Sequence, residues 1–126
     1  MSDLRVLILD DEAQLRSTLV EFLAGEGYEP SCAPDPRAGV ELATICGPDI
    51  ILLDVDMPRV SGLDAIPALL LAAPNARIIV ITGKASAELA EKTLRRGAFD
   101  FLPKPLDYEA LGRSLAAART LKAAGA

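Results

Sequence analysis

The sequence predicts one α/β domain in which five parallel strands alternate with five helices. Short runs that are apolar at every position, including Val6–Leu9, Ile50–Leu53 and Ile78–Ile81, are typical of parallel strands buried on both faces. Segments with apolar residues at helical spacing separate these runs. A chain of 126 residues is long enough for one good core. We assign residues 1–123 to the domain and 124–126 to a C-terminal tail or the start of a linker.

The first strand leads through Asp10-Asp11 into a helix with apolar residues at helical spacing. Gly25 and Gly27 end that helix. The second strand, at 28–33, contains Pro30, which has no amide hydrogen to donate to a strand ladder. This strand is therefore expected at an edge of the sheet.

The second helix begins at Asp35-Pro36, where a capping residue precedes a proline at the first helical position. The third strand ends at Asp54, and a loop at 57–62 leads to a third helix at 63–71. Pro67 inside that helix removes a hydrogen bond, which costs about 3 kcal/mol unless the proline falls in the first turn. We therefore expect a later start or a kink.

The fourth helix, at 85–96, has an early glutamate and two arginines in its last turn, and Gly97 follows it. This arrangement suits the helix dipole. A weaker apolar run at 99–102 gives the fifth strand, and Asp107 can cap a fifth helix with one apolar stripe. Right-handed crossovers and an edge position for the second strand favour the sheet order 2-1-3-4-5, with helices on both faces.

Polar side chains follow the strands. Asp10-Asp11, Asp54, Thr82 and Lys104-Pro105 each lie at or just past the end of an apolar run. In open α/β sheets the ligand site lies beyond the carboxyl ends of the strands, near the point where strand order reverses. Three carboxylates, a hydroxyl and an ammonium should therefore converge. Because three negative charges with one positive charge would repel each other, we expect a metal ion to join them.

Each of these residues also has an ordinary structural interpretation. A lone Asp at a strand end is usually a turn former or a helix cap. Thr82 alone would be a strand residue, and Lys104 alone a solvated loop lysine. Asp54 is harder to explain in this way, because it follows four aliphatic residues and Asp56 comes two positions later. Pro105 could hold its peptide bond in cis and direct the preceding lysine toward the site.

Composition excludes several functional classes. The net charge of −5 argues against a nucleic-acid surface on this domain. No apolar stretch approaches the roughly 20 residues of a membrane span, and the N-terminal residues 1–5 lack signal-peptide character, so we expect a cytoplasmic location. Cys32 and Cys46 are expected to be reduced. The absence of histidine removes Ser-His and Cys-His nucleophile pairs and most catalytic zinc sites.

These residues resemble the receiver domains of two-component response regulators, and the likeness covers essentially the whole chain. The motifs that carry it, in the expected order and spacing, are Asp10-Asp11-Glu12, Leu53–Pro58, Ser61-Gly62, Thr82, Gly97–Phe101 and Lys104-Pro105. The resemblance implies a flavodoxin-like (βα)5 fold. It also implies a phosphoacceptor signalling domain that is no enzyme beyond promoting its own phosphorylation and dephosphorylation.

The resemblance implies phosphorylation of Asp54 by a sensor histidine kinase or a phosphotransfer protein. It implies that Asp11, Asp54 and the backbone carbonyl of Asp56 hold Mg²⁺, with Asp10 acting through water. Mg²⁺ prefers oxygen ligands and bridges carboxylate to phosphate. Phosphoryl transfer depends mainly on positioning and charge neutralisation, so the absence of histidine is no obstacle.

By the same resemblance, Thr82 and Lys104 contact the phosphoryl oxygens, and Thr82, Phe101 and Pro105 belong to the switch. When the Thr82 hydroxyl moves to the phosphoryl group, it leaves space for an inward rotation of the Phe101 ring. A fixed core phenylalanine is the alternative. The face formed by the fourth helix, fifth strand and fifth helix could bind partners or a second copy. An output domain outside this chain could read the switch.

Two charged residues should flank the opening of the site. Asp56 lies two residues past Asp54, and Lys84 lies two residues past Thr82. Their opposite charges could pair and partly cover the approach of a hydrolytic water. Alternatively, they are solvated charges that together contribute about 0–1 kcal/mol.

Two other functions fit parts of the pattern. Asp54-Val55-Asp56 resembles the nucleophile motif of haloacid-dehalogenase-like phosphatases, but in that family the motif follows the first strand. A flavin-binding, flavodoxin-like module would need a Ser/Thr/Gly-rich loop after the first strand. Asp10-Asp11-Glu12 stands there instead and would repel a phosphate in the absence of a metal. We therefore favour neither alternative.

Overall fold

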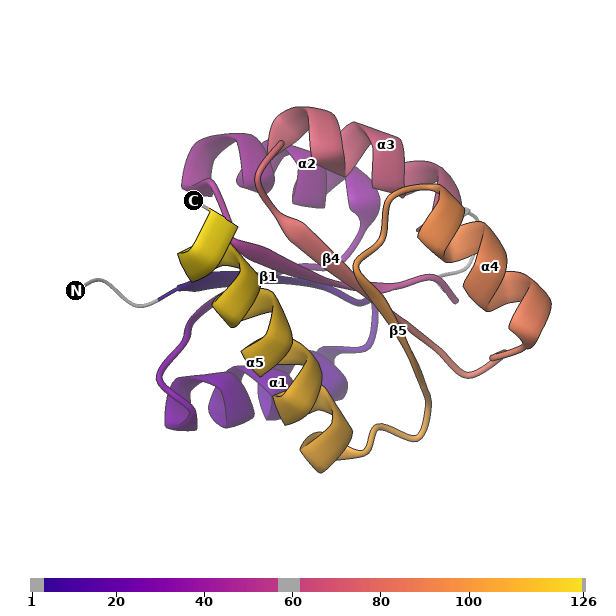
Figure 1. Ribbon diagram of the computed structural model, residues 1–126. Coiled ribbons are helices and arrows are strands. Elements are labelled where there is room, and N and C mark those ends of the chain that lie inside the picture. Colours follow the sequence, from indigo (N-terminus) through magenta and orange to yellow (C-terminus); the bar gives the residue numbers. More distant parts are fainter. Residues whose placement is uncertain (1–3, 57–61, 126) are drawn as a thin grey trace.

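The computed structural model describes residues 4–56 and 62–125, with side chains through residue 120. Strands and helices alternate along the described chain (Figure 1). Their bounds are β1 (Arg5–Leu9), α1 (Ala13–Gly25), β2 (Glu29–Ala33), α2 (Pro36–Cys46), β3 (Ile50–Asp54), α3 (Gly62–Ala72), β4 (Arg77–Thr82), α4 (Ala87–Arg95), β5 (Asp100–Pro103) and α5 (Tyr108–Gly125). Of the loop expected at 57–62, residues 57–61 lie outside the described part, and Gly62 begins α3.

Within the described chain, the strands form one parallel sheet of order β2-β1-β3-β4-β5, which confirms the predicted order. β2, with Pro30, lies at an edge as expected. Strand order reverses at the β1–β3 pair, whose last matched residues are Leu9 and Leu53. Residues that follow these two strands therefore share one edge of the sheet.

Each face of the sheet has its own aliphatic core. Helices α1 and α5 cover one face and α2 and α3 cover the other, with α4 beside α3 (Figure 1). Leu7 and Leu9 pack toward α2 and α3, whereas Val6 and Ile8 pack toward α1 and α5. Because successive strand residues point to opposite faces, burial of both faces explains why the strands are apolar at every position.

Pro67 does not delay the start of α3. The helix begins at Gly62 and continues through Pro67. Of the two expectations, a later start or a kink, the later start is wrong, and the kink stays a prediction. Pro67 is exposed, while Ala65, Ile66 and Leu69 on the same helix are buried in the core. Helices in proteins are stabilised mostly by such packing of an apolar face, which here outweighs the hydrogen bond that the proline removes.

Side-chain caps fix the starts of three helices. The predicted caps Asp35 and Asp107 are confirmed, because each accepts a hydrogen bond from a backbone amide in the first turn of α2 or α5. Ser86 caps α4 by accepting a hydrogen bond of 3.0 Å from the Leu89 amide. α4 therefore begins at Ala87, two residues later than predicted.

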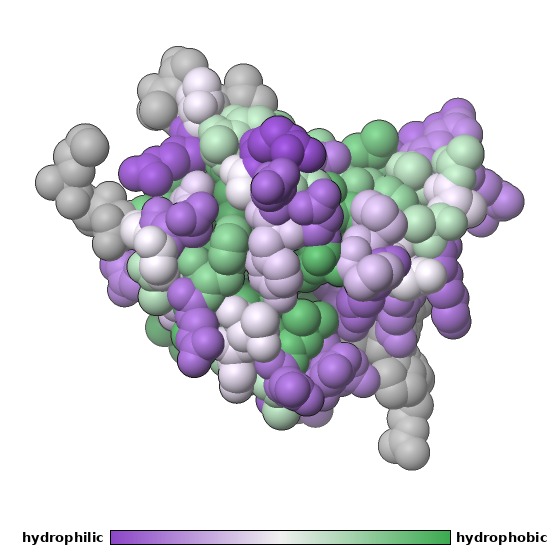
Figure 2. Space-filling view, turned by 90° about the horizontal axis from the view of Figure 1, so that it is seen from below, coloured by the Kyte–Doolittle hydropathy of each residue, from purple (hydrophilic) through white to green (hydrophobic). Residues whose placement is uncertain are grey.

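Hydrophilic side chains surround small apolar areas on the side of α1 and α5 (Figure 2). A groove of about 510 Å³ on this side is lined by residues that include Phe22, Tyr108 and Arg113. Cys32 is exposed and Cys46 is half-buried, and both are free thiols. In the part of the chain that the structure describes, no helix has the length and apolar character needed to cross a membrane.

Candidate metal and phosphoryl site

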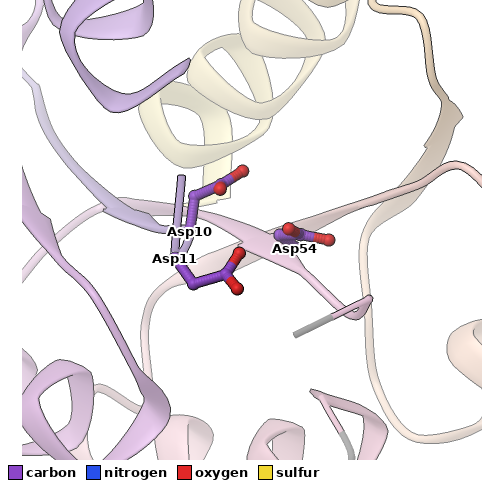
Figure 3. Close-up of side chains that lie close together, drawn as sticks. All are labelled: Asp10, Asp11 and Asp54. Carbon is purple, nitrogen blue, oxygen red and sulfur yellow. The ribbon is translucent and has the colours of Figure 1, made fainter. Parts of the chain in front are cut away.

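Three aspartates meet where strand order reverses. Asp10 and Asp11 follow β1, and Asp54 is the last residue of β3. One carboxylate oxygen from each lies within 4.8 Å of the others, and Figure 3 shows the three side chains next to one another at the ends of these strands. Asp10 and Asp54 are buried, with 1% and 3% of their surface exposed, whereas Asp11 is exposed. The structure therefore brings together the acidic residues that the sequence singled out.

Backbone amides fix the orientation of two of these carboxylates. The Glu12 amide donates to Asp10 Oδ1, and the Asp56 amide donates to Asp54 Oδ1, each at 2.8 Å. Both bonds span two residues, the local pattern with which aspartate forms a turn. One oxygen of each aspartate thus accepts the hydrogen bond of a local turn. The second oxygen of each is oriented toward Lys104.

Lys104 supplies the positive charge of the site. Its Nζ donates to Asp54 Oδ2 at 3.2 Å and lies 3.9 Å from Asp10 Oδ2. The bond between Lys104 and Pro105 is cis. Burial lowers the pKa of Lys104, but the hydrogen bond to Asp54 and the surrounding carboxylates outweigh this effect and raise the pKa above 10.5. Lys104 is therefore an ammonium at neutral pH.

One ammonium does not balance three carboxylates. Burial raises the pKa of Asp10 to about 6; the charge of Asp54 adds to this effect, while the Glu12 amide and Lys104 oppose it. Burial and neighbouring carboxylates both disfavour the charged form of a carboxyl group. Because the ligand atoms offered here are all oxygens, the residues suit a hard divalent cation such as Mg²⁺ or Ca²⁺.

Thr82, at the end of β4, is hydrogen-bonded to the side chain of Asp56. Thr82 Oγ1 donates to Asp56 Oδ1 at 2.6 Å, and the Gly83 amide donates to Asp56 Oδ2 at 2.6 Å. The Lys84 amide donates in turn to Thr82 Oγ1 at 3.0 Å. Burial raises the pKa of Asp56, but the hydrogen bonds from Thr82 and Gly83 more than offset this effect, so the pKa lies below 3.8 and the carboxylate is ionised.

The sequence did not reveal this use of the Asp56 side chain. The resemblance gives Asp56 a role through its backbone carbonyl, and the sequence spacing allows an ion pair with Lys84. In the described part of the chain these two side chains form no ion pair within 4.0 Å, although the charge of Lys84 contributes to the lowered pKa of Asp56. Only the Asp54-Val55-Asp56 spacing could have indicated a role for the second carboxylate, and this spacing does not predict the direction of the Asp56 side chain.

Phe101 lies on β5 and is half-buried against the core beneath α2 and α3. Its backbone is in register with Val80, two residues before Thr82. Because residues two apart on a strand share a face, Phe101 and Thr82 lie on the same side of the sheet on neighbouring strands. The Phe101 ring is not fully buried. Pro105 is exposed.

The sequence matches the family described as "Response regulator receiver domain" over residues 6–116. This chain belongs to the response regulator receiver domain family. The match covers the strand ends that carry the acidic residues, Thr82 and Lys104. It confirms the resemblance and, together with the observed sheet order, the predicted flavodoxin-like fold.

Relatives agree with this assignment. The chain is 37% identical over 102 residues to the chemotaxis protein CheY of Thermotoga maritima, covering 80% of this receiver domain and 85% of CheY. It is 36% identical over 107 residues to the regulatory protein AtoC of Escherichia coli, covering 85% of this chain but 23% of AtoC. The chain therefore spans less than a quarter of that relative's length.

A solved structure links the fold to the chemistry. A response regulator protein from Burkholderia pseudomallei, solved with a phosphorylated aspartic acid, calcium ion and citrate, superposes with a TM-score of 0.85. It is 31% identical, and the match covers 98% of this receiver domain and 74% of that chain. The predicted function as a receiver domain is thus confirmed, and these comparisons support neither the phosphatase nor the flavin alternative.

Proposed function

We propose that this receiver domain accepts a phosphoryl group on Asp54 from a histidine kinase or a phosphotransfer protein, and that Mg²⁺ is required. The observation that carries the proposal is the convergence of Asp10, Asp11 and Asp54 within 4.8 Å, with Lys104 Nζ 3.2 Å from Asp54 Oδ2. The proposal includes no enzymatic activity beyond the domain's own phosphorylation and dephosphorylation.

Asp54 is the nucleophile in this account. The Asp56 amide and the Lys104 ammonium each bind one of its oxygens and hold the carboxylate at the end of β3. In the transfer, a carboxylate oxygen of Asp54 forms a bond to phosphorus while the bond from phosphorus to the donor breaks. A carboxylate that attacks phosphorus needs little proton transfer. Positioning and charge neutralisation are the main contributions that the protein has to make.

Asp11, Asp54 and the backbone carbonyl of Asp56 would hold Mg²⁺, and Asp10 would act through water. When bound, Mg²⁺ supplies the positive charge that lets carboxylate and phosphoryl oxygens approach one another. The three aspartates carry a charge of −3, which Mg²⁺ and Lys104 together balance. The convergence of one carboxylate oxygen from each of these aspartates within 4.8 Å supports this assignment.

Thr82 and Lys104 would contact the transferred phosphoryl oxygens. Movement of Thr82 would be coupled to Phe101 and Pro105 and so to the face formed by α4, β5 and α5. We propose this face as the surface that binds partners, a second copy or an output domain. We place the domain in the cytoplasm, where a sensor histidine kinase presents its phosphoryl group.

Incubation with a small phosphodonor such as acetyl phosphate tests the proposal. Wild-type protein with Mg²⁺ should gain one phosphate by intact mass, because the residues above assemble one acceptor site. Asp54→Asn should gain none. Asp64→Asn is the matched control, since this exposed aspartate on α3 lies outside the site, and it should behave as wild type. Undiminished incorporation in EDTA, or in Asp54→Asn, would contradict the proposal.

A further inference from the structure

The end of β4 presents two hydrogen-bond donors, and one carboxylate occupies both. Asp56 Oδ1 accepts from the Thr82 hydroxyl and Oδ2 accepts from the Gly83 amide, each at 2.6 Å. Hydrogen bonds to an ionised acceptor are shorter and stronger than those between neutral groups. Asp56 thus joins the segment after β3 to the end of β4.

The Thr82 hydroxyl has no second proton to offer. A hydroxyl carries one hydrogen, and here that hydrogen goes to Asp56. The Lys84 amide donates to the same oxygen at 3.0 Å, which helps to fix the direction of the hydroxyl hydrogen. Thr82 is fully buried, so water does not compete for it. Thr82 cannot donate to a phosphoryl oxygen while its bond to Asp56 persists.

We propose that the Asp56 carboxylate is an inhibitory contact: it competes with the phosphoryl group for the Thr82 hydroxyl and stabilises the unphosphorylated state. This inference rests on the proposed function. Phosphorylation of Asp54 must break the Asp56–Thr82 bond before Thr82 can be recruited. Asp56 is half-buried, so its released carboxylate can turn toward water, and the negative charge gained at Asp54 favours that release.

A simpler effect must be separated from this competition. Asp56 is negative and close to the site, so its removal would favour any bound anion, whatever Thr82 does. The two explanations differ in their dependence on the hydroxyl. Competition for Thr82 disappears when Thr82 has no hydroxyl, whereas charge repulsion persists. A double-mutant cycle between Asp56 and Thr82 therefore distinguishes them.

The experiment measures binding of beryllofluoride, a phosphoryl analogue, at saturating Mg²⁺ by ¹⁹F NMR. Asp56→Ala keeps the backbone carbonyl and should bind about tenfold more tightly than wild type, equivalent to about 1.4 kcal/mol. In a Thr82→Ala background, the same substitution should change the affinity less than threefold. Asp64→Ala, which removes an exposed aspartate outside the site, should leave the affinity unchanged.

Equal tightening in both backgrounds would show charge repulsion alone and overturn the inference, as would no tightening in either. If Asp56→Ala does not fold, Asp56→Asn provides the same test. It keeps the size of the side chain but offers one acceptor oxygen, so it should give a smaller effect that still depends on Thr82. If wild type binds beryllofluoride and Asp54→Asn does not, the proposed function stands, even when the double-mutant cycle shows no coupling between Asp56 and Thr82. Absence of wild-type binding would instead refute the proposed function.

Discussion

The raised pKa of Asp10 makes the stability of the metal-free protein depend on pH. Asp10 is 1% exposed, and its pKa rises from 3.8 to about 6 in the folded state, chiefly through burial. Between these values the folded state binds more protons than the unfolded state. Protonation of Asp10 therefore adds to the free energy of unfolding. This contribution is complete below pH 3.8 and is lost as pH rises through 6. A shift of about two pKa units corresponds to about 3 kcal/mol.

Asp10→Asn should therefore stabilise the metal-free protein at neutral pH. Asparagine keeps an oxygen that can accept the Glu12 amide hydrogen but cannot ionise. In urea unfolding with EDTA, the advantage of the variant over wild type should grow by about 2 kcal/mol between about pH 4.5 and pH 7.5. The lowered pKa of Asp56 and the raised pKa of Lys104 fall outside this window. The same advantage at both pH values would contradict the assignment to Asp10.

At the scale of single residues, the sequence predicted which side chains meet but not how Asp56 is used. Asp10, Asp11, Asp54 and Lys104 follow strands, and parallel strands carry whatever follows them to one edge of the sheet. The direction of the Asp56 side chain depends instead on Thr82, 26 residues away in the sequence, with which it forms a hydrogen bond. No local pattern encodes such a contact.

At the scale of elements, Gly39 on α2 packs against Leu9 of β1. A Cβ atom at this position would collide with the side chain of Leu9, which is fully buried. Gly112 on α5 differs, because a Cβ atom there would meet nothing within 4 Å. Glycine inside a helix otherwise costs about 1 kcal/mol relative to alanine.

This contrast predicts that replacing glycine by alanine has opposite effects on the free energy of unfolding at the two positions. Gly39→Ala should lower the free energy of unfolding by about 1–3 kcal/mol, because overpacking outweighs the gain in helix propensity. Gly112→Ala should raise it by up to about 1 kcal/mol. Urea denaturation of both variants and wild type measures the difference. Stabilisation of both variants would show that α2 can move away from β1 at little cost.

The starts of the helices show why element boundaries were harder to predict than strands. Pro67 suggested a later start for α3, but the buried residues Ala65, Ile66 and Leu69 hold the helix in place. Burial of this kind depends on the completed sheet and is not visible in local propensity. The strands were easier, because burial on both faces leaves an apolar run in the sequence itself.

At the scale of the whole molecule, we propose that β4 and β5 connect the site to the α4–β5–α5 face. Thr82 and Phe101 lie on the same side of these paired strands, and the Phe101 ring is half-buried. Capture of Thr82 by a phosphoryl group would change the space beside this ring. Two arrangements of these side chains would then report the state of Asp54 to a partner.

Binding of beryllofluoride with Mg²⁺ should shift the amide resonances around Phe101 in wild type and shift them much less in Thr82→Ala. Amides near Ile45, an exposed residue near the end of α2, serve as the internal control and should move little in either protein. ¹H–¹⁵N spectra of the two proteins measure the effect. Equal shifts around Phe101 in both would show that Thr82 does not couple the site to this face.

We expect Asp54, and not a neighbouring aspartate, to receive the phosphoryl group. Borohydride reduction converts an aspartyl phosphate to homoserine, which peptide mass spectrometry can locate. After treatment of the wild-type domain with acetyl phosphate and Mg²⁺, we predict homoserine at position 54 alone, and none when EDTA is present. Homoserine at position 10, 11 or 56, or unmodified Asp54 in protein shown to be phosphorylated, would contradict this account.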